Sequence, residues 1–493
     1  MLFNSLEFLI FFPLVVAIYF VIPKKARYIW LLVCSYYFYM GWNAKYALLI
    51  ATSTIITYLS GIIIDRYKED WIRKATVAVS FVSNLGILMF FKYFDFILEN
   101  INAVLGVIGV ELVSNPFDLL LPVGISFYTF QALSYTVDVY RGDIKAEKNL
   151  LRYALFVSFF PQLVAGPIER SKNLLNQLRN VDKIHVWNYQ RVASGMVQMT
   201  WGMFQKMVIA DRVAIFVNGV YDNLHAVGTV ETIAAALAFS VQIYCDFAAY
   251  STIATGAAKV MGFELMENFN TPYFADSIAD FWRRWHISLS SWFRDYLYIP
   301  LGGNRKGITR KYINLMIVFL VSGLWHGASW NFIIWGGLNG LYQVVGGLTK
   351  PYREKLTDMM HVRKDVFSYK FGQILFTFGL TTLTWVFFRA KTIEEAFYFF
   401  RQMGKWNPWA IFNERLFEFG LDRVEMNVLL ISIFIMILID LVRYIKKQQF
   451  SDFMMEQNIW FRWIIVIGMV LACLIYGVYG INFDSSQFIY FQF

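Results

Sequence analysis

The chain has little charge and almost no cysteine for its length. Of its 493 residues, 16% are charged, three are cysteine and five are histidine, whereas 58% are hydrophobic and 19% are aromatic. Soluble domains carry about 25% charged residues, so this composition excludes a soluble core with a polar shell. Cys34, Cys245 and Cys473 each stand alone in an apolar segment, which excludes a disulfide framework and predicts no metal site.

A basic face is also lacking, although the net charge is +9. Lysine and arginine are spread over short loops between apolar runs, which is typical of topology signals and not of a nucleic-acid surface. We therefore expect membrane lipids, and no nucleic acid, among the partners. The first residues lack the charged region and cleavage site of a signal peptide, so we expect residues 8–22 to be retained as a span.

Long apolar runs take the place of the missing charge. Residues 8–22, 47–64, 428–439 and 464–480 carry no internal charge and approach or reach the ~20 residues that a helix needs to cross ~30 Å of hydrocarbon. They do not alternate with period two, as barrel strands do. The sequence predicts an all-α, polytopic membrane protein with about a dozen spans. The predicted spans are 6–22, 27–42, 45–64, 75–95, 118–139, 195–219, 230–250, 312–329, 331–349, 371–390, 426–442 and 460–480.

The distribution of basic residues predicts the orientation. They follow the first, third and fifth spans, and the positive-inside bias makes those loops cytoplasmic and the N-terminus external. On this scheme residues 92–116, 391–425 and the C-terminal tail are external, and residues 259–311 are cytoplasmic. Small residues in 331–349 allow close helix packing, so we expect that helix to be central in the bundle.

Two segments are too irregular for a clean crossing. Residues 153–170 are interrupted by Pro161, Gly166 and Pro167 and have basic residues on both flanks, so we expect a re-entrant segment at a cytoplasmic cavity. Residues 278–298 mix tryptophan and phenylalanine with arginine, which predicts one interfacial helix in the headgroup region.

Two histidines flank a basic glycine loop. His326 lies fourteen residues into the span 312–329, which at ~1.5 Å per residue is roughly 20 Å from the cytoplasmic face. An ionisable side chain at that depth is costly and is a candidate for function. His286 is expected at the cytoplasmic interface. The loop 300–307 between them combines backbone N–H groups with cations, which suits a phosphate or pyrophosphate.

Each of these features also has a purely structural interpretation. His326 can bond Ser322 or Ser329, His286 can lie at the interface beside Trp282, and the loop can be a tight turn with topology charge. The combination favours function, because polar residues gathered around one buried imidazole are expensive without a ligand or a reaction. The candidate donor-binding residues are Arg283, Arg284, Trp285, Ser290, Asn304, Arg305 and Lys306, and the candidate supporting residues are Trp325, Ser329 and Asn331.

These residues resemble the motifs of the membrane-bound O-acyltransferase family, in particular its bacterial branch of alginate O-acetylation. The resemblance lies in residues 280–305 (DFWRRWHISLSSWFRDYLYIPLGGNR) and in LWHGA at 324–328. LPVGISFYTFQ at 121–131, FFPQLVAGPI at 159–168, QIYCDFAAYS at 242–251 and the terminal FIYFQF are also similar. The motifs follow one another in the family's order over almost the whole chain.

The resemblance implies one family domain over 1–493, with N-terminal helices at 1–140, a catalytic core at 141–349 and C-terminal helices at 350–493. It implies that His326 is catalytic and that His286 is its polar partner. The donor would be a cytoplasmic thioester, acetyl-CoA, with no bound cofactor, and the acceptor an exopolysaccharide such as alginate. The protein would lie in the bacterial cytoplasmic membrane. Because its external segments are too small for a polymer-binding cleft, a hydrolase-like extracytoplasmic transferase is expected as partner.

Three alternatives remain at this point. One is D-alanyl transfer to teichoic acid, which the related D-alanyl branch of the family performs. Another is a non-enzymatic transporter of a lipid-linked sugar that uses the histidines as a proton relay. The third is haem ligation by His286 and His326, which their different expected depths disfavour.

Overall fold

A computed structural model describes residues 1–117, 121–185 and 187–479, and every regular element in these ranges is helical. Within these described ranges, seven helices are long and apolar enough to cross a membrane. They are Tyr46–Arg66, Asp70–Val107, Thr229–Met261, Ile308–His326, Phe367–Arg389, Arg423–Lys446 and Ile459–Tyr476. The helix Leu6–Val21 is also apolar but shorter. The all-α, polytopic class is confirmed, whereas the total of about a dozen spans stays a prediction.

The chain folds into two compact units. Unit 1 comprises residues 1–196 and 253–266, and unit 2 comprises residues 197–252 and 267–493. The irregular segment 153–170 belongs to unit 1, and both histidines belong to unit 2. The subdivision of the family domain at residues 140 and 349 stays a prediction.

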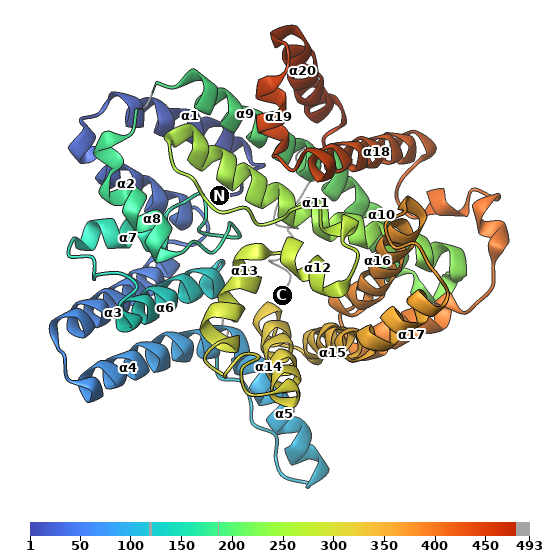
Figure 1. The fold of residues 1–493 in the computed structure, drawn as a ribbon, viewed down its shortest axis with the longest axis horizontal. Coiled ribbons are helices and arrows are strands. Elements are labelled where there is room, and N and C mark those ends of the chain that lie inside the picture. The colour runs from blue at the N-terminus through green and yellow to red at the C-terminus, as the bar shows by residue number, and fades with distance from the viewer. Residues whose placement is uncertain (118–120, 186, 480–493) are drawn as a thin grey trace. The chain divides into compact units, whose positions relative to one another are not determined.

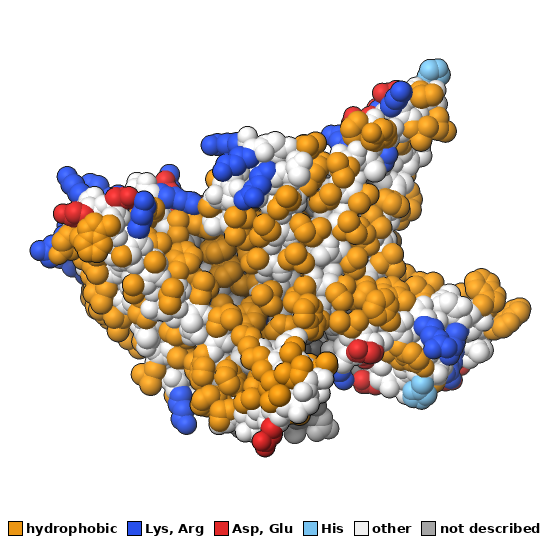
Figure 2. All heavy atoms as spheres, turned by 90° about the horizontal axis from the view of Figure 1, so that it is seen from below, with side chains coloured by type: hydrophobic (Ala, Val, Ile, Leu, Met, Phe, Trp, Pro, Cys, Tyr) orange, Lys and Arg blue, Asp and Glu red, His pale blue; other side chains and the backbone are white. Residues whose placement is uncertain are grey.

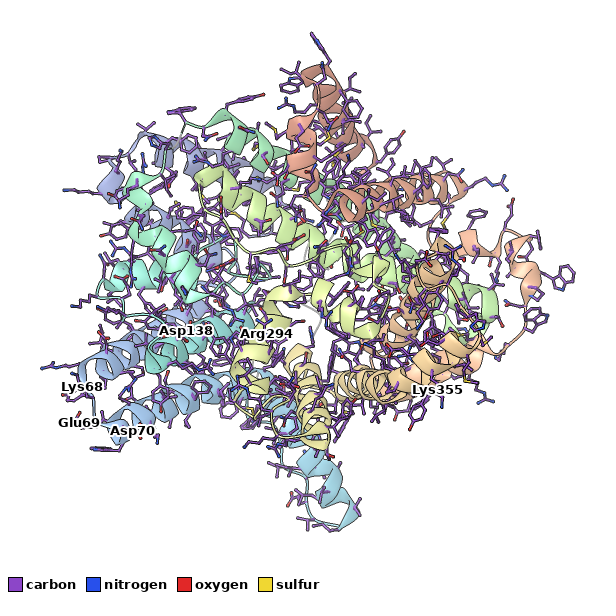
Figure 3. All side chains as sticks on the ribbon, in the orientation of Figure 1. Lys68, Glu69, Asp70, Asp138, Arg294 and Lys355 are labelled. Atoms are coloured by element: carbon purple, nitrogen blue, oxygen red, sulfur yellow. The ribbon has the colours of Figure 1, made fainter. Side chains whose placement is uncertain are left out.

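Unit 1 consists of paired helices joined by short turns (Figure 1). Its helices are α1 (Leu6–Val21), α2 (Arg27–Met40), α3 (Ala47–Arg66), α4 (Asp70–Leu88), α5 (Phe94–Val107), α6 (Ile125–Arg141), α7 (Leu150–Ser158) and α8 (Ser171–Arg179), with 3₁₀ turns at Lys24–Ala26, Ala44–Tyr46 and Val181–Lys183. The turn between α3 and α4 is charged, and Figure 3 labels Lys68, Glu69 and Asp70 there. A charged turn between two apolar helices fits a hairpin that ends at a membrane surface.

The predicted end of the fourth span at residue 95 is wrong. A π-helical turn, Met89–Tyr93, joins α4 directly to α5, so that the helix continues to Val107. The apolar residues of 96–108 extend the helical pattern beyond Lys92, and one charged side chain does not end a helix. The following predicted span, 118–139, begins as helix at Ile125, and its residues 118–120 lie outside the described ranges.

The predicted break within residues 153–170 is confirmed. Helix α7 ends at Ser158, and a turn stabilised by the Gly166 N–H donating to the Gln162 carbonyl follows (3.1 Å). Gly124, in the left-handed region, packs on this turn so closely that a Cβ would lie 2.6 Å from the Leu163 oxygen. The segments 121–131 and 159–168, which carry two of the family-like motifs, therefore pack together. A re-entrant path through the membrane stays a prediction.

Unit 2 contains the remaining helices and parts of two that extend beyond it. Helices α9 (Tyr189–Phe204) and α11 (Thr229–Met261) contribute residues to both units. The others are α10 (Asp211–Asp222), α12 (Ile278–Arg284), α13 (Ile287–Phe293), α14 (Ile308–His326), α15 (Trp330–Met359), α16 (Phe367–Arg389), α17 (Ile393–Met403), α18 (Arg423–Lys446), α19 (Phe450–Glu456) and α20 (Ile459–Tyr476). Shorter turns lie at Gln205–Ala210, Leu224–Ala226, Pro272–Phe274, Arg294–Tyr298, Pro408–Ile411 and Arg415–Glu418.

The expected single interfacial helix at 278–298 is wrong. The chain breaks at Trp285 and His286 into α12 and α13, followed by the π-helical turn Arg294–Tyr298. The large aromatic side chains of this segment are buried, with Trp285 only 2% exposed. Their apolar area is better buried against other aromatic rings than at a headgroup surface, and this tertiary packing overrides the interfacial pattern.

Several helices expose apolar side chains along their length. On α18 Phe434 is 60% exposed, and on α20 Ile464 and Leu474 are 69% and 61% exposed. Figure 2 shows hydrophobic side chains over much of the visible face, while lysine and arginine gather in a few patches. A soluble protein does not expose so much apolar area, so these faces fit contact with membrane lipid.

Candidate active site

The two histidines meet inside unit 2. The ring centroids of His286 and His326 are 6.3 Å apart, and the two residues are 0% and 5% exposed. The expectation that they lie at different depths is therefore wrong, because the chain before α13 folds inward and does not stay at a surface. The argument from depth against haem falls with it, and an absorption spectrum of the purified protein decides that alternative.

The backbone places each ring at an element boundary. α14 ends at His326, where Gly327 is extended and allows the chain to turn into α15. His286 joins α12 to α13 in the left-handed region, with φ of 44°. A residue other than glycine in that region stores about 1–3 kcal/mol of strain, which persists only where surrounding contacts impose it.

Those contacts come from the segment just before α12. The Asn268 carbonyl accepts the Ile287 N–H (2.9 Å), and the Asn270 N–H donates to the Arg284 carbonyl (2.9 Å). The side-chain oxygen of Asn268 lies 3.2 Å from His286 Nδ1 and accepts the N–H and the hydroxyl of Ser288 at 3.1 and 2.9 Å. The segment 268–270 thus holds residues on both sides of the strained position, with Arg284 before it and Ile287 and Ser288 after it.

Aromatic rings enclose the His286 imidazole. The ring of Phe247, on α11, lies 4.6 Å away edge-on, and the rings of Phe269 and Trp325 lie 6.3 and 6.1 Å away. This burial lowers the pKa of His286 to about 3, because the cation would lose its hydration. His286 lies outside the candidate spanning helices and is neutral at physiological pH.

The His326 imidazole lies in a second aromatic group. Trp325, Trp335 and Phe388 have ring centroids 4.9, 5.0 and 5.5 Å from it, all nearly edge to face. They come from α14, α15 and α16, so residues of three helices surround this ring. Apolar rings around this imidazole exclude bulk water and place its ring nitrogens in a low-dielectric site.

Glycines allow α14 and α15 to approach closely enough to form this group. A Cβ at Gly336 would lie 2.3 Å from the Phe319 carbonyl oxygen, and one at Gly340 would lie 3.0 Å from the Met316 sulfur. The expectation of close packing by the small residues of 331–349 is confirmed. The turn at Gly327 is equally tight, because a Cβ there would lie 2.2 Å from the Phe332 ring.

Comparison with a protein-family model identifies the family of this chain. The model of the MBOAT, membrane-bound O-acyltransferase family, matches residues 36–390, which include both histidines and all three helices around His326. The chain belongs to the membrane-bound O-acyltransferase family.

Several curated proteins are similar to this acyltransferase over most of its length. A "probable alginate O-acetylase" of Azotobacter vinelandii is 37% identical, covering 83% of this chain and 79% of its own. A peptidoglycan O-acetyltransferase of Helicobacter pylori is 32% identical, covering 100% of this chain and 98% of its own. A teichoic acid D-alanyltransferase of Bacillus subtilis is 30% identical but covers 45% of this chain and 58% of its own. The protein is therefore an enzyme, a membrane O-acyltransferase.

The predicted donor residues of this acyltransferase have different environments. Arg284 is fixed by Asp280 (2.7 Å) and lies over the Tyr444 ring, which is a structural role. Arg283, Asn304, Arg305 and Lys306 are exposed. Trp285 is packed against Trp385 with centroids 5.0 Å apart, and the Ser290 hydroxyl donates to the Trp285 carbonyl (3.3 Å).

Four backbone N–H groups of the loop 300–307, which is expected to bind a phosphate, close the turn instead. The N–H groups of Leu301, Gly302, Gly303 and Arg305 donate to carbonyl oxygens of residues 297–302. The glycines serve the turn itself, with φ of 104° at Gly302 and 55° at Gly303. Donors that close a turn cannot also bind an anion, and the loop offers its exposed cations to a ligand.

Among the predicted supporting residues, Trp325 packs against both histidine rings. The Asn331 amide instead donates to the Ala390 carbonyl (2.7 Å) and ties α15 to the end of α16. Ser329 is the N-cap residue of α15 and makes no side-chain capping bond. Only Trp325 of the three lies against the histidines by these contacts.

Sequence reasoning missed Asn268, Phe247, Trp335 and Phe388. Phe247 lies within the family-like segment 242–251, whose pattern assigns no role to it. Asn268 is one polar residue in a connection, and Trp335 and Phe388 are aromatic residues in apolar helices. Only the tertiary fold distinguishes them from many similar residues in this chain.

Proposed function

We propose that this acyltransferase moves an acetyl group from a cytoplasmic thioester, acetyl-CoA, to a hydroxyl group of an extracytoplasmic glycan. The observation that carries the proposal is the pair of buried imidazoles, 6.3 Å apart within aromatic rings. No other described part of unit 2 combines two neutral bases with such a shielded environment. A dry site would also protect the thioester from hydrolysis.

His326 is assigned as the general base. Its neutral imidazole takes the proton of the acceptor hydroxyl while the hydroxyl oxygen attacks the thioester carbonyl carbon. The carbon–sulfur bond breaks, and the departing thiolate takes the proton from the imidazolium. The ester and the free thiol are formed, and the imidazole returns to its starting state. Atoms and charge balance without a metal or a bound cofactor.

His286 is assigned as a neutral partner that orients a reacting group. With its pKa lowered to about 3 by burial, it cannot hold a proton between the two chemical steps at physiological pH. Each ring nitrogen of the neutral imidazole either accepts or donates one hydrogen bond, according to the tautomer present. This division of roles explains why two histidines are placed together while only one is proposed to cycle its proton.

The acceptor is proposed from the relatives. Those that align with most of this chain are named for O-acetylation of alginate or of peptidoglycan, both of which are glycans with free hydroxyl groups. The peptidoglycan enzyme aligns with the whole chain, and the alginate enzymes have the higher identity. We therefore propose a glycan hydroxyl as the acceptor class, with alginate or another exopolysaccharide and peptidoglycan as the polymers to examine first.

The route across the membrane is part of the same proposal. We propose that the enzyme lies in the bacterial cytoplasmic membrane. Its N-terminus is proposed to be outside, because of the distribution of basic residues. A hydrolase-like extracytoplasmic transferase is proposed to supply the hydroxyl that attacks at His326 and then to pass the acetyl group to the glycan, because residues 391–425 largely pack as α17 and two 3₁₀ turns and offer no separate binding domain. We propose that the terminal FIYFQF helps to dock this partner, and it lies outside the described residues.

The test compares cell-surface glycans by mass spectrometry in wild-type cells, in a deletion strain and in strains carrying His326→Ala or His326→Gln. We expect acetyl esters to disappear in the deletion strain and in both variants, with normal amounts of the protein in the membrane. Persistent acetyl esters in His326→Ala would overturn the assignment of the base. Loss of D-alanyl esters in place of acetyl esters would favour the D-alanyl alternative.

The non-enzymatic transporter makes a different prediction for the same strains. A transporter of a lipid-linked sugar would reduce the amount of polymer, whereas an acetyltransferase changes its acetylation and leaves its amount. Polymer yield is therefore measured beside the ester content. A reduced yield with a normal ester fraction would contradict the proposed reaction.

A further inference from the structure

The side-chain amide of Asn268 has only one orientation that satisfies its neighbours. The Ser288 backbone N–H, which can only donate, lies 3.1 Å from the Asn268 side-chain oxygen. On the other side, the Asn268 amide nitrogen donates to the Ser251 hydroxyl at 3.0 Å. Exchanging the oxygen and the nitrogen would set a donor against the Ser288 N–H. The atom that faces His286 Nδ1 at 3.2 Å is therefore an acceptor.

An acceptor at this position determines the tautomer of a neutral histidine. Of the two ring nitrogens, one carries hydrogen and the other carries a lone pair, and the partner of one nitrogen fixes the state of the other. Because the Asn268 oxygen can only accept, Nδ1 of His286 must carry the hydrogen. Nε2 then carries the lone pair.

We infer that Asn268 is a positioning residue that holds His286 as the Nδ1–H tautomer, so that Nε2 acts as a hydrogen-bond acceptor within the histidine pair. The role of this tautomer in acyl transfer rests on the proposed function, whereas the tautomer itself follows from the hydrogen bonds alone. An acceptor at Nε2 suits a donor group in the site, such as the acceptor hydroxyl or an N–H of His326. A protonated Nε2 would instead repel the same groups.

The segment that carries Asn268 is itself clamped from α18. One Arg443 nitrogen donates to the Phe269 carbonyl at 3.1 Å and to the Glu267 carboxylate at 2.9 Å, on either side of Asn268. The Arg443 guanidinium is held by Asp440, which also accepts the Tyr244 hydroxyl (3.2 and 2.7 Å). A buried network that fixes the residues flanking Asn268 keeps its side-chain amide within hydrogen-bonding distance of the His286 imidazole.

Three of the rings around His286 offer no acceptor to its Nδ1. Phe247 and Phe269 are apolar, and the Trp325 indole can only donate. His326 is the titratable group nearest to it among the described ring contacts. The Asn268 oxygen, unlike these three rings, presents an acceptor to Nδ1.

The direct test reads the tautomer and does not require activity. Protein labelled with ¹⁵N-histidine is studied in lipid by nitrogen NMR at neutral pH, and the His286 signals are assigned by their loss in His286→Gln. We expect Nδ1 protonated and Nε2 unprotonated in the wild type. A protonated Nε2 in the wild-type protein would overturn the inference, whatever the enzyme is found to catalyse.

Variants then connect the tautomer to the reaction. Asn268→Ala should allow the Nε2–H form and lower acetyl transfer by about 10–100-fold, as the loss of an orienting partner of a histidine typically does. Asn268→Asp keeps an acceptor beside Nδ1 and raises the pKa of His286, so we expect it to retain the Nδ1–H form and to lose activity toward acidic pH. Arg443→Lys should reproduce a weaker form of the Asn268→Ala effect.

A matched control separates these effects from general destabilisation. Asn84, in unit 1, is also buried and hydrogen-bonded through both side-chain atoms, to Ser53 and to the Ser80 carbonyl. Asn84→Ala should leave the tautomer unchanged and the pH profile with its wild-type shape. If Asn268→Ala does not fold, the wild-type spectrum and Asn268→Asp still decide the question. Equal spectra and equal pH profiles for Asn268→Ala and Asn84→Ala would refute the positioning role while leaving the test of His326 untouched.

Discussion

Gly323 of α14 lies against the backbone of Phe332 of α15 with no room for a side chain. A Cβ at Gly323 would lie 2.2 Å from the Phe332 carbonyl oxygen and 3.3 Å from the Gly336 Cα. The two helices thus meet backbone to backbone one turn before His326. This crossing sets the distance of the His326 ring from the Trp335 ring, because both residues belong to these helices.

Gly323→Ala should therefore destabilise the protein by about 1–3 kcal/mol, as overpacking of a filled core does. Acetyl transfer should fall as well, because α14 must shift and carries His326 with it. Thermal unfolding of the purified protein and transfer from labelled acetyl-CoA measure the two effects. Gly346→Ala on α15 is the matched control, since a Cβ there meets nothing within 4 Å. Equal losses in both variants would contradict the close crossing.

His326→Ala should reduce acetyl transfer by about 10²–10⁴-fold, the usual contribution of a general base. The ring lies at a helix end among aromatic side chains, so we expect the variant to remain inserted and folded. His361→Asn is the control, because His361 is exposed and its left-handed backbone accepts asparagine. A comparable loss in the control would mean that the assay responds to protein quality and not to chemistry.

His286 should make the protein less stable in mild acid. Its pKa is lowered by burial from 6.5 to about 3, so the unfolded chain binds a proton that the folded protein excludes. The contribution of the neutral His286 to the free energy of unfolding is fully present above pH 6.5. It decreases as the pH falls from 6.5 toward 3, by at most about 1.4 kcal/mol per pH unit. In His286→Gln the dependence of the melting temperature on pH should be shallower over this window. A wild-type slope in the variant would show that His286 is not the group protonated on unfolding.

The fold class of this protein could be predicted from its sequence, because that class depends on composition and on long apolar runs. The helix from Ile308 to His326 and the break before Pro161 follow from local pattern, since hydropathy and proline act over a few residues. The meeting of His286 with His326 does not, because it depends on a left-handed backbone at His286 that Asn268 imposes from another segment. An aromatic stretch beside arginines has the same pattern whether it lies on a membrane surface or inside a core, and only the packing of Trp285 decides.

The exposed cations of the loop 300–307 should contribute to use of the donor. Four of its backbone N–H groups close the turn, and Arg305 and Lys306 are exposed cations that can attract phosphates. Replacing both with glutamine should raise KM for acetyl-CoA by about 3–10-fold, the effect of a few exposed ion pairs, and added salt should weaken the wild type similarly. The acceptor dependence should not change. Lys355→Gln, an exposed lysine on α15 labelled in Figure 3, is the control.

An unchanged KM after the double replacement would assign Arg305 and Lys306 to topology alone. A change in both donor and acceptor dependence would point instead to a shift of α14, which begins at Ile308 directly after the loop. The two outcomes differ in which substrate is affected, so one set of initial rates at varied donor and acceptor separates them.

The orientation in the membrane is tested by single cysteines at Asn304 and Ser114. Both side chains are exposed, whereas the native Cys34, Cys245 and Cys473 are buried and can be replaced to give a silent background. The positive-inside bias places residue 304 in the cytoplasm and residue 114 outside. A membrane-impermeant maleimide should therefore label Ser114→Cys in intact cells and Asn304→Cys only after the membrane is opened. Labelling of both positions in intact cells would contradict this topology and would put the loop 300–307 on the side where acetyl-CoA is absent, which removes the proposed donor role of Arg305 and Lys306 as well.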